Sequence, residues 1–425
     1  MRVAPARACA YRVVRRVFEQ GAYADRALHA ESATLVERDR RLAMALTYGT
    51  VQRRATLDYV AGRLSSRPPE EIDPPVLAAL RLGLFQLLLL KGVADHAAVN
   101  DSVELAKPAG ASFVNAVLRR AAREGHAILD ELDDETPAHA AILHSIPVWI
   151  AELWWEQLGP EQARALMRRC NEPAESAIRV NALVSTTEQV KGELPLTSYP
   201  APGLTEGLVL DGAFDAHGSV LSERGAIMPQ SRGSMLVARM LDPQAGERVL
   251  DLCAAPGAKT THVSALMMGD EGEIVAVERH PGRAKSLAAT CARMHADNVR
   301  IEVGDAATYG AQGRFDRVLV DPPCSGLGTL QARPDLRWRA SSEAIERVAT
   351  LQRRVLANGA AAVRPGGTLV YSVCTISRVE SSDVVEALLR TDPSLELEEE
   401  VQLLPHRDGT DGFFIARLRR YPKTQ

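Results

Sequence analysis

The chain has 425 residues, of which 46% are hydrophobic and 24% charged, and its formal net charge is −4. This length predicts two or three domains, and the composition is typical of soluble globular protein. The sequence has no run of eighteen apolar residues, no apolar signal core at its start and no C-x-x-C pair among its six cysteines. We therefore expect a cytoplasmic protein with no membrane contact, no disulfide framework and no metal site.

Residues 1–130 show helical periodicity and no strand signal. Apolar side chains recur three and four residues apart, for example between Val13 and Phe18 and between Leu77 and Leu88. This pattern predicts an all-α bundle. The segment holds 19 Lys and Arg against 14 Asp and Glu, which suits a polyanionic partner, although a solvated surface explains it equally well. The candidate RNA contacts are six arginines: Arg12, Arg15, Arg16, Arg38, Arg40 and Arg41.

Residues 131–227 predict a linker and then a small α+β subdomain. Residues 130–137 are acidic and rich in turn formers, and residues 147–158 look helical. Three of the four tryptophans lie in that helix, and we interpret them as packing residues rather than a base-stacking platform. Residues 177–181 predict a strand, and the prolines and glycines that follow, up to about Ser222, favour short strands.

From Met228 onward, strand and helix patterns alternate. Strands are expected near residues 248–252, 273–278, 299–303, 315–321 and 368–373, and helices near 260–268, 281–295, 342–363 and 379–389. Alternation of this kind predicts a parallel sheet with helices on both faces. Residues 395–404 and 412–418 are expected to close the sheet as an antiparallel pair.

Residues 247–261 predict a buried strand, a tight loop and the start of a helix. Small residues in the loop allow a ligand to approach the backbone, and a helix start leaves N–H groups unpaired. Asp251, at the strand end, can accept hydrogen bonds from an ammonium or hydroxyl group. The loop lacks the G-x-G-x-x-G and G-x-x-x-x-G-K-[ST] patterns. A ligand with a cation and a ribose, such as S-adenosylmethionine, therefore fits better than a dinucleotide or a nucleotide triphosphate. The alternative is an ordinary strand–loop–helix turn.

Two later strand patterns each end near a cysteine. Cys324 follows Asp321-Pro322-Pro323, and Cys374 lies at the end of the pattern that begins at Leu369. The carboxyl ends of the strands form the ligand crevice of an open α/β sheet. We therefore expect both thiols to converge on the site that Asp251 lines. For either cysteine alone, a buried structural thiol is the alternative.

Three motifs carry a family resemblance: Asp-Leu-Cys-Ala-Ala-Pro-Gly-Ala-Lys-Thr, Asp-Pro-Pro-Cys-Ser-Gly and Ser-Val-Cys-Thr. In this order they resemble the Nol1/Nop2/Sun family of RNA cytosine-5 methyltransferases, and the resemblance runs from about Ile178 to the C-terminus. The N-terminal third resembles a NusB-like helical domain, and this combination resembles the bacterial Sun (Fmu) branch, which methylates 16S ribosomal RNA.

The resemblance implies a multidomain fold with S-adenosylmethionine as cofactor and 16S ribosomal RNA as partner, and we expect a monomer. Residues 1–130 would form a NusB-like helical RNA-binding domain. Residues 131–227 would form a linker helix and a small RNA-recognition-like subdomain. Residues 228–425 would form a Rossmann-like α/β methyltransferase domain.

The resemblance and the strand-end positions together imply a cofactor site. Glu278, at the end of the second strand, is a candidate acceptor for the ribose hydroxyls. Asp305, after the third strand, is placed to accept from the adenine amine, and Arg283 matches the family pattern. The full set of expected cofactor residues is Asp251, Cys253, Ala254, Ala255, Pro256, Gly257, Ala258, Lys259, Glu278, Arg283, Asp305 and Asp321.

Carbon 5 of cytosine is a poor nucleophile until a thiolate adds to carbon 6, which calls for covalent catalysis. By resemblance, Cys374 matches the nucleophile, and Cys324 matches a second cysteine associated with breakdown of the adduct. Asp321 is the candidate for cytosine N3, and Lys259 would hold the base or lower a thiol pKa.

Two alternatives remain open on the sequence alone. One is the same chemistry on transfer RNA or another RNA. The other is a NusB-like RNA-binding or assembly factor with an inert methyltransferase fold. The sequence does not identify the cytosine.

Overall fold

A computed structural model describes residues 3–212, 214–267 and 272–422. The chain divides into two compact units. The helical unit comprises Met1–Glu172 and Leu330–Ala340, and the α/β unit comprises Pro173–Thr329 and Ser341–Gln425. The finer division into domains at residues 1–130, 131–227 and 228–425 stays a prediction.

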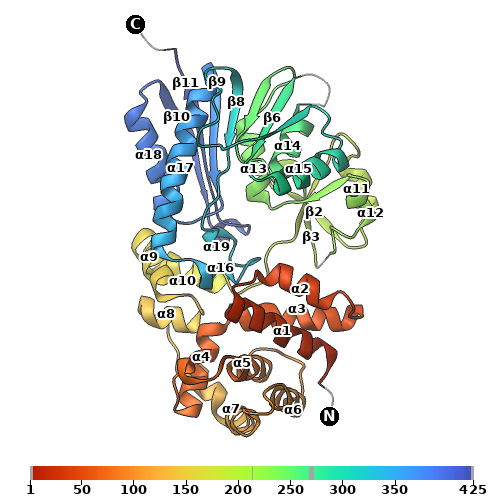
Figure 1. Cartoon of the computed structure of the whole chain (residues 1–425), viewed down its shortest axis with the longest axis vertical. Coiled ribbons are helices and arrows are strands. Elements are labelled where there is room, and N and C mark those ends of the chain that lie inside the picture. The colour runs from red at the N-terminus through yellow and green to blue at the C-terminus, as the bar shows by residue number, and fades with distance from the viewer. Residues whose placement is uncertain (1–2, 213, 268–271, 423–425) are drawn as a thin grey trace. The chain divides into compact units, whose positions relative to one another are not determined.

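The helical unit confirms the all-α prediction, since no strand occurs among its described residues. Proline begins several helices, where its fixed φ and missing N–H cost nothing. The fifth helix is mostly apolar, is buried on nearly all sides and forms the centre of the bundle. The elements, visible in the lower part of Figure 1, are α1 (Pro5–Gln20), α2 (Ala24–Ser32), α3 (Glu37–Gln52), α4 (Arg54–Ser65), η1 (Pro69–Glu71), α5 (Pro74–Leu88), α6 (Asp95–Leu105), α7 (Ala111–Asp130), α8 (Pro137–Leu143), α9 (Val148–Leu158) and α10 (Pro160–Arg169).

One short segment of the helical unit comes from far along the chain. Residues 330–340, which include α16 (Leu336–Arg339), pack with residues 1–172 although α/β-unit sequence flanks them on both sides. Arg337 is fully buried there. Its guanidinium donates to the carbonyl groups of Gln52, Ser145, Cys170 and Leu330 and to the side chain of Asn171. The sequence analysis did not predict this insertion.

The α/β unit begins with the small subdomain, whose four strands form an antiparallel sheet in the order β2-β3-β1-β4. Its helix α11 has a capping box in which the Thr186 hydroxyl accepts from the backbone of Gln189. The expected small α+β element is therefore confirmed. Its elements are β1 (Ala177–Val180), α11 (Thr187–Glu193), β2 (Ser198–Ala201), β3 (Leu204–Leu210), α12 (Val220–Glu223) and β4 (Ile227–Pro229).

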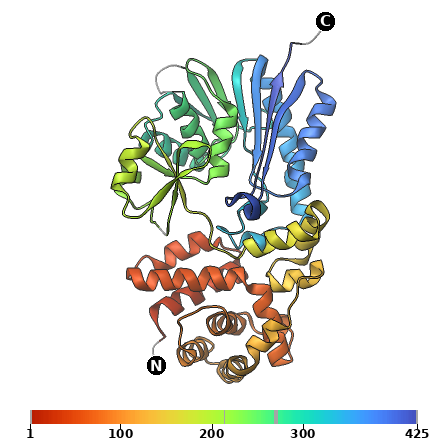
Figure 2. The same cartoon turned by 180° about the vertical axis from the view of Figure 1, so that it is seen from behind.

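The rest of the α/β unit is a seven-stranded sheet in the order β10-β11-β9-β8-β5-β6-β7 (Figures 1 and 2). Neighbouring strands from β9 to β7 are parallel, and β11 runs antiparallel to both β9 and β10. The Rossmann-like fold and the closing antiparallel pair are thus confirmed. The strands are β5 (Arg248–Asp251), β6 (Glu273–Glu278), β7 (Val299–Val303), β8 (Phe315–Val320), β9 (Val363–Val373), β10 (Leu395–Leu403) and β11 (Phe413–Arg420).

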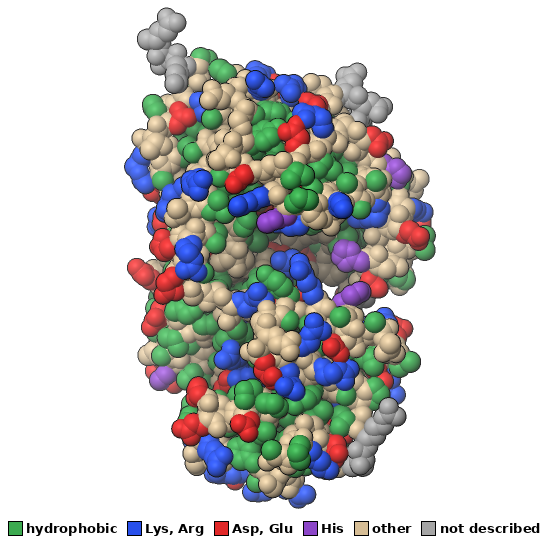
Figure 3. Space-filling view, in the orientation of Figure 1, with side chains coloured by type: hydrophobic (Ala, Val, Ile, Leu, Met, Phe, Trp, Pro, Cys, Tyr) green, Lys and Arg blue, Asp and Glu red, His purple; other side chains and the backbone are tan. Residues whose placement is uncertain are grey.

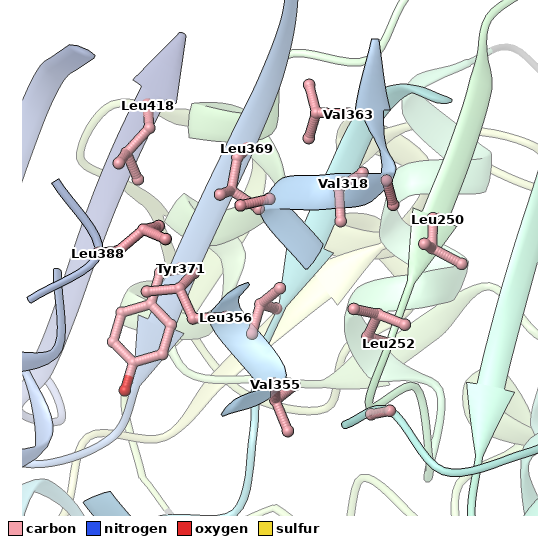
Figure 4. Packing of buried hydrophobic residues seen from close by; sticks show 14 of the residues in the cluster. Leu250, Leu252, Val318, Val355, Leu356, Val363, Leu369, Tyr371, Leu388 and Leu418 are labelled. Atoms are coloured by element: carbon pink, nitrogen blue, oxygen red, sulfur yellow. The ribbon is translucent and has the colours of Figure 1, made fainter. Parts of the chain in front are cut away.

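Helices cover both faces of this sheet because successive strand residues point to opposite faces. Leu250 belongs to a buried cluster that includes residues of α17 and α18, whereas its neighbour Val249 belongs to a cluster with residues of α13 and α14. Figure 4 shows the first of these faces, with Leu250, Val318 and Leu369 in register on adjacent strands. The helices are α13 (Arg232–Leu241), α14 (Ala258–Leu266), α15 (Pro281–Arg293), α17 (Ser342–Ala362), α18 (Ser382–Thr391) and α19 (Pro405–Asp408), with 3-10 turns η2 (Leu327–Thr329) and η3 (Arg378–Glu380).

Candidate active site

Five adjacent strands each bring one candidate side chain to the same edge of the large sheet. In the order β9-β8-β5-β6-β7, the residues at or just past the strand ends are Cys374, Asp321, Asp251, Glu278 and Asp305. Parallel strands have their carboxyl ends at one edge, so the sheet itself collects these residues. Asp251, Glu278 and Asp305 occupy one half of this edge, and Asp321 and Cys374 lie on the other half.

Asp251 is buried at the end of β5, with 2% of its surface exposed. Its carboxylate accepts from the Thr260 hydroxyl at 2.8 Å and from the Cys253 backbone N–H at 3.3 Å. Burial raises the pKa of Asp251 to about 6, although these hydrogen bonds oppose the shift. A cation placed beside this carboxylate would offset the cost of burying its charge.

The loop after β5 encloses a small cavity. Its lining combines small side chains with two carboxylates and one lysine: Asp251, Cys253, Ala254, Ala255, Pro256, Ala258, Lys259 and Asp321. Burial raises the pKa of the Cys253 thiol well above its ordinary value. That thiol therefore stays protonated, as expected of a residue that contributes shape rather than reactivity.

Gly257 lies at the start of α14 and faces α15 rather than lining the cavity. Its φ is +108°, and a Cβ at this position would lie 2.8 Å from Leu287 Cδ1. We expected this glycine to allow close approach of a ligand. That expectation stays a prediction; the left-handed backbone and the packing against α15 are further reasons for glycine at this position.

Arg283 links the ends of β5 and β6. Its Nη2 donates to the Ala255 carbonyl at 2.7 Å, and its Nε lies 3.5 Å from the buried carboxylate of Glu278. Glu278 also accepts from the backbone of His280. Asp305, beyond β7, accepts from the backbone of Ala307 at 3.0 Å. The acids at these strand ends are therefore oriented by hydrogen bonds rather than free to rotate.

The two thiols lie side by side, with 3.3 Å between Cys324 Sγ and Cys374 Sγ. The hydrogen bond from Cys324 lowers the pKa of Cys374, and the Lys259 ammonium adds to this effect against the burial of the thiol. The same hydrogen bond, together with burial, raises the pKa of Cys324 well above its ordinary value. The pair therefore ionises first at Cys374, and Cys324 remains the protonated donor.

Lys259 and Asp321 form an ion pair between the acids and the thiols. Lys259 Nζ lies 2.6 Å from Asp321 Oδ2, and Asp321 Oδ1 accepts from the Ser372 hydroxyl at 2.8 Å. Burial opposes the charge on Lys259, but Asp321 outweighs it, so the pKa of Lys259 is raised. The ammonium group is thus held charged beside Cys374.

Two buried polar residues in this region were not singled out as site residues from the sequence. Arg179 of β1 donates to the Ala258 carbonyl and to the Thr261 hydroxyl, and so holds the first turn of α14. Glu380 of η3 contacts the residues that follow both cysteines. The sequence places Arg179 only within the strand predicted at residues 177–181. For Glu380 the local sequence gives no signal, because its partners lie on other elements.

The remaining three cysteines lie in or next to helices rather than at strand ends. Cys9 in α1, Cys170 after α10 and Cys291 in α15 are buried, and burial raises the pKa of each. Among the described residues there is no group of three or more His, Cys, Asp or Glu side chains that could hold a metal ion. In the same part of the chain, no helix is long and apolar enough to cross a membrane.

The chain is similar to known proteins over most of its length. The family model described as "16S rRNA methyltransferase RsmB/F" matches residues 238–419, and the NusB family model matches residues 4–123. A Bacillus subtilis protein called "Probable ribosomal RNA small subunit methyltransferase B" is 34% identical over 92% of both chains. The chain belongs to the RsmB/F methyltransferase family. The NusB match coincides with the helical residues that begin this RsmB/F-family chain.

Solved structures agree with the family assignment. The structure titled "Crystal Structure of PH0851" has a TM-score of 0.83 and 26% identity, covering 99% of this RsmB/F-family chain and 100% of that one. NSun6 from Pyrococcus horikoshii, solved with SFG, has a TM-score of 0.59 and 25% identity, covering 64% of this chain and 97% of that one. SFG is an analogue of S-adenosylmethionine.

Proposed function

We propose that this methyltransferase uses S-adenosylmethionine to methylate carbon 5 of a cytosine in 16S ribosomal RNA. The observation that carries the proposal is the pair of thiols 3.3 Å apart, beside the Lys259–Asp321 ion pair, at the carboxyl ends of β8 and β9. The printed name of the Bacillus subtilis relative supports a small-subunit ribosomal RNA substrate. The thiol pair supports covalent chemistry on a pyrimidine ring.

The residues on the acidic half of the edge fit the cofactor. Buried Asp251 suits the cofactor's ammonium group, Glu278 suits its ribose hydroxyls, and Asp305 suits its adenine amine. Ala254 and Ala255 have small side chains, which leave room for cofactor atoms close to the loop backbone. When bound, S-adenosylmethionine supplies an electrophilic methyl group.

The thiol half of the edge fits the base. Cys374, which ionises first, would attack carbon 6 of cytosine and form a carbon–sulfur bond. Electron density then moves onto carbon 5 and N3, so carbon 5 becomes nucleophilic enough to accept a methyl group. Lys259 stabilises the Cys374 thiolate before attack and lies where negative charge develops.

Asp321 is the group we assign to cytosine N3. An ionised carboxylate only accepts hydrogen bonds. The Asp321 carboxylate would therefore bind N3 when N3 carries a proton, and would favour protonation of N3. The hydrogen bonds from Lys259 and Ser372 fix the carboxylate in one orientation. The base therefore meets a preset acceptor instead of a rotating side chain.

Cys324 would complete the cycle. After transfer, the proton on carbon 5 must leave before the carbon 6–sulfur bond can break and release Cys374. Once Cys374 is bonded to carbon, its thiolate no longer accepts the hydrogen bond that keeps Cys324 protonated. Cys324 is then free to ionise and to assist removal of the carbon 5 proton.

The test is transfer of labelled methyl to purified RNA. The full chain should methylate unmodified 16S ribosomal RNA at a cytosine, and bisulfite mapping should place 5-methylcytosine at one position. Equal or faster transfer to transfer RNA would support the first alternative. Binding of 16S ribosomal RNA without any transfer would support an assembly factor with an inert fold.

A further inference from the structure

Glu380 is a buried carboxylate that the proposed chemistry does not use. It lies in η3, its exposed fraction is 0%, and it follows Cys374 by six residues. Burying a carboxylate costs free energy unless hydrogen bonds satisfy its oxygens. Burial raises the pKa of Glu380, and the hydrogen bonds to it oppose that shift. A carboxylate that is buried at this cost in free energy is a candidate for a functional role.

Its carboxylate binds the residue that follows each of the two cysteines. Oε1 accepts from the Ser325 backbone N–H at 2.7 Å, and Oε2 accepts from the Ser325 hydroxyl at 2.5 Å. Oε2 also accepts from the Thr375 hydroxyl at 3.0 Å. The two hydroxyl oxygens lie 2.9 Å apart. One side chain therefore joins the loop of Cys324 to the loop of Cys374.

Glu380 is itself fixed from two sides. Its backbone carbonyl accepts from the buried Tyr371 hydroxyl at 2.7 Å. Gln352 of α17 donates to the Pro323 carbonyl at 2.9 Å and lies 3.4 Å from Glu380 Oε1. The Cys324 loop is thus bound at Pro323 and at Ser325, one residue to either side of the thiol.

We propose that Glu380 is a positioning residue that keeps the two thiols aligned by binding the residue that follows each cysteine. The effect of Glu380 on catalysis rests on the proposed function, whereas its alignment of the two thiols does not. The cysteines come from loops after different strands, and only Glu380 and the Ser325–Thr375 contact join their following residues among the described hydrogen bonds. The Gly328 N–H also donates to the Cys374 carbonyl at 3.0 Å. Without Glu380, the two loops would be joined only by this backbone bond and by contacts of the cysteines and the two hydroxyls themselves, so the thiols would separate more often.

Disulfide formation measures this alignment without RNA or cofactor. Diamide is a thiol oxidant: one thiolate adds to its N=N bond, and the second thiolate then displaces the reduced hydrazine nitrogen. A sulfur–sulfur bond forms, and diamide takes up two electrons and two protons. The rate of the second step depends on how often Cys324 and Cys374 meet. Mass spectrometry of the disulfide-linked peptides measures this rate in the full chain.

Three substitutions of Glu380 distinguish the effect of its hydrogen bonds from the effect of its volume. Glu380→Ala removes every bond, and Glu380→Met fills the volume without bonds. Glu380→Gln can keep its oxygen toward the Ser325 N–H and turn its amide toward the two hydroxyl oxygens, which can accept. We expect Ala and Met to slow the disulfide step and kcat by about 10- to 100-fold, because misplaced groups react less often. Gln should recover most of that loss.

A matched control comes from another buried acid of the same unit. Glu206 accepts from Arg239 and pairs with His262, away from both cysteine loops. Glu206→Met should lower the melting temperature as the Glu380 variants do, yet leave the diamide rate unchanged. Should the Glu380 variants fail to fold, Thr375→Val, which deletes one hydroxyl at constant volume, must slow the disulfide step in the same direction.

A wild-type diamide rate in folded Glu380→Met, or in Thr375→Val, would overturn the proposal. Failure of the proposed function gives a different result. A wild-type chain that never methylates RNA would remove the proposed activity. The diamide rates would still report whether Glu380 aligns the thiols.

Discussion

At the scale of single residues, the site depends on how neighbours share protons. Cys324 and Cys374 are the same chemical group, yet their shared hydrogen bond moves their pKa values in opposite directions. Asp251 and Asp321 are also alike in type, but one is buried beside a hydroxyl and the other is paired with Lys259. Such divided environments assign different roles to identical side chains.

The division of labour between the thiols predicts opposite phenotypes. Cys374→Ser should abolish turnover and form no covalent RNA complex, since a hydroxyl is a far weaker nucleophile at neutral pH. Cys324→Ala should still attack and transfer the methyl group, and then remain bonded to its product. A denaturing gel with labelled RNA should show a cofactor-dependent slow band for Cys324→Ala only.

The double variant is the control for this gel and should show no band. An adduct in Cys374→Ser but not in Cys324→Ala would mean that the roles are exchanged. Activity without any adduct in either variant would remove covalent catalysis and, with it, the cytosine-5 assignment.

The pKa of about 6 at Asp251 predicts a pH dependence of cofactor affinity. Below that pH the carboxyl is protonated and neutral, so it no longer attracts the ammonium group of S-adenosylmethionine. Affinity should therefore fall as pH drops, by about tenfold at one unit below the pKa. Calorimetry between about pH 5 and 7.5, a range in which most proteins stay folded, should show this slope in the wild type. Asp251→Asn, which cannot ionise, should bind more weakly and give a flat profile; parallel profiles would refute the assignment.

At the scale of elements, two short segments do more than connect. The loop between β5 and α14 depends on Gly257 for a left-handed φ, and on Arg179 for the position of its helix. Residues 330–340 lie between β8 and α17 in sequence but pack with the helical unit, where Arg337 is the fully buried centre. Burial lowers the pKa of Arg337 to about 10, and the guanidinium stays charged at neutral pH.

Gly257→Ala should disturb the cofactor loop. The added Cβ would sit 2.8 Å from Leu287 Cδ1, on a backbone with a φ of +108°. The strained φ alone costs on the order of 1–3 kcal/mol. We expect a lower melting temperature and weaker binding of S-adenosylmethionine. Gly282→Ala is the control, because nothing lies within 4 Å of a Cβ there and its φ is not positive; an equal effect of both substitutions would contradict this account.

Arg337→Ala should destabilise the helical unit. It would leave the carbonyl groups of Ser145, Cys170 and Leu330 without this donor in a buried setting. Leaving a buried acceptor without its donor costs on the order of 1–3 kcal/mol for each group. Urea unfolding should show this loss, whereas Arg339→Ala, whose side chain is exposed, should change stability far less. An Arg337→Ala midpoint equal to that of the wild type would refute an anchoring role.

At the scale of the whole molecule, the chain couples a helical unit that carries no reactive constellation to an α/β unit that carries the site. The excess of five positive charges in residues 1–130 suggested RNA contacts. Four of the six candidate arginines form ion pairs with nearby acids: Arg12 and Arg16 with Glu31, Arg15 with Glu19, and Arg41 with Glu37. Figure 3 shows Lys and Arg interspersed with Asp and Glu over the visible face of this unit.

We predict that the helical unit contributes RNA affinity through its less paired arginines. Replacing Arg38 and Arg40 with Gln should weaken binding of ribosomal RNA and flatten its salt dependence by about 0.7–0.9 per lost phosphate contact. Replacing Arg12 and Arg15 should matter less, since acids already balance them. Cofactor binding should be unchanged in both double variants. Fluorescence titrations at several salt concentrations test this, and equal slopes in all proteins would contradict it.

Charge variants are preferable to truncation for this test. A fragment that begins near Ala140 would cut through the helical unit, which extends to Glu172. It would also strip residues 330–340 of the helices that surround Arg337. Loss of RNA binding by such a fragment could then reflect exposed core rather than lost contacts.

The sequence by itself determined the elements and the family motifs that they carry. The strand predicted at residues 315–321 centres on the apolar residues Val318, Leu319 and Val320, and in the helices apolar residues recur every three to four positions. Both signals are local, so β8 and α17 lie where they were predicted. The motifs around Asp251, Cys324 and Cys374 are contiguous in the chain, which is why they could be recognised. Their shared edge followed from the rule that parallel strands end on one side.

Only the tertiary structure decided how distant residues meet. Cys324 and Cys374 are 50 residues apart in sequence, and no local pattern specifies the 3.3 Å between their sulfurs. The partners of Glu380 lie on loops after two strands, and those of Arg337 are up to 285 residues away. Such contacts arise when separate elements pack together, and buried charges satisfy whatever groups that packing brings near. Their identity is therefore a property of the folded chain rather than of any one stretch of it.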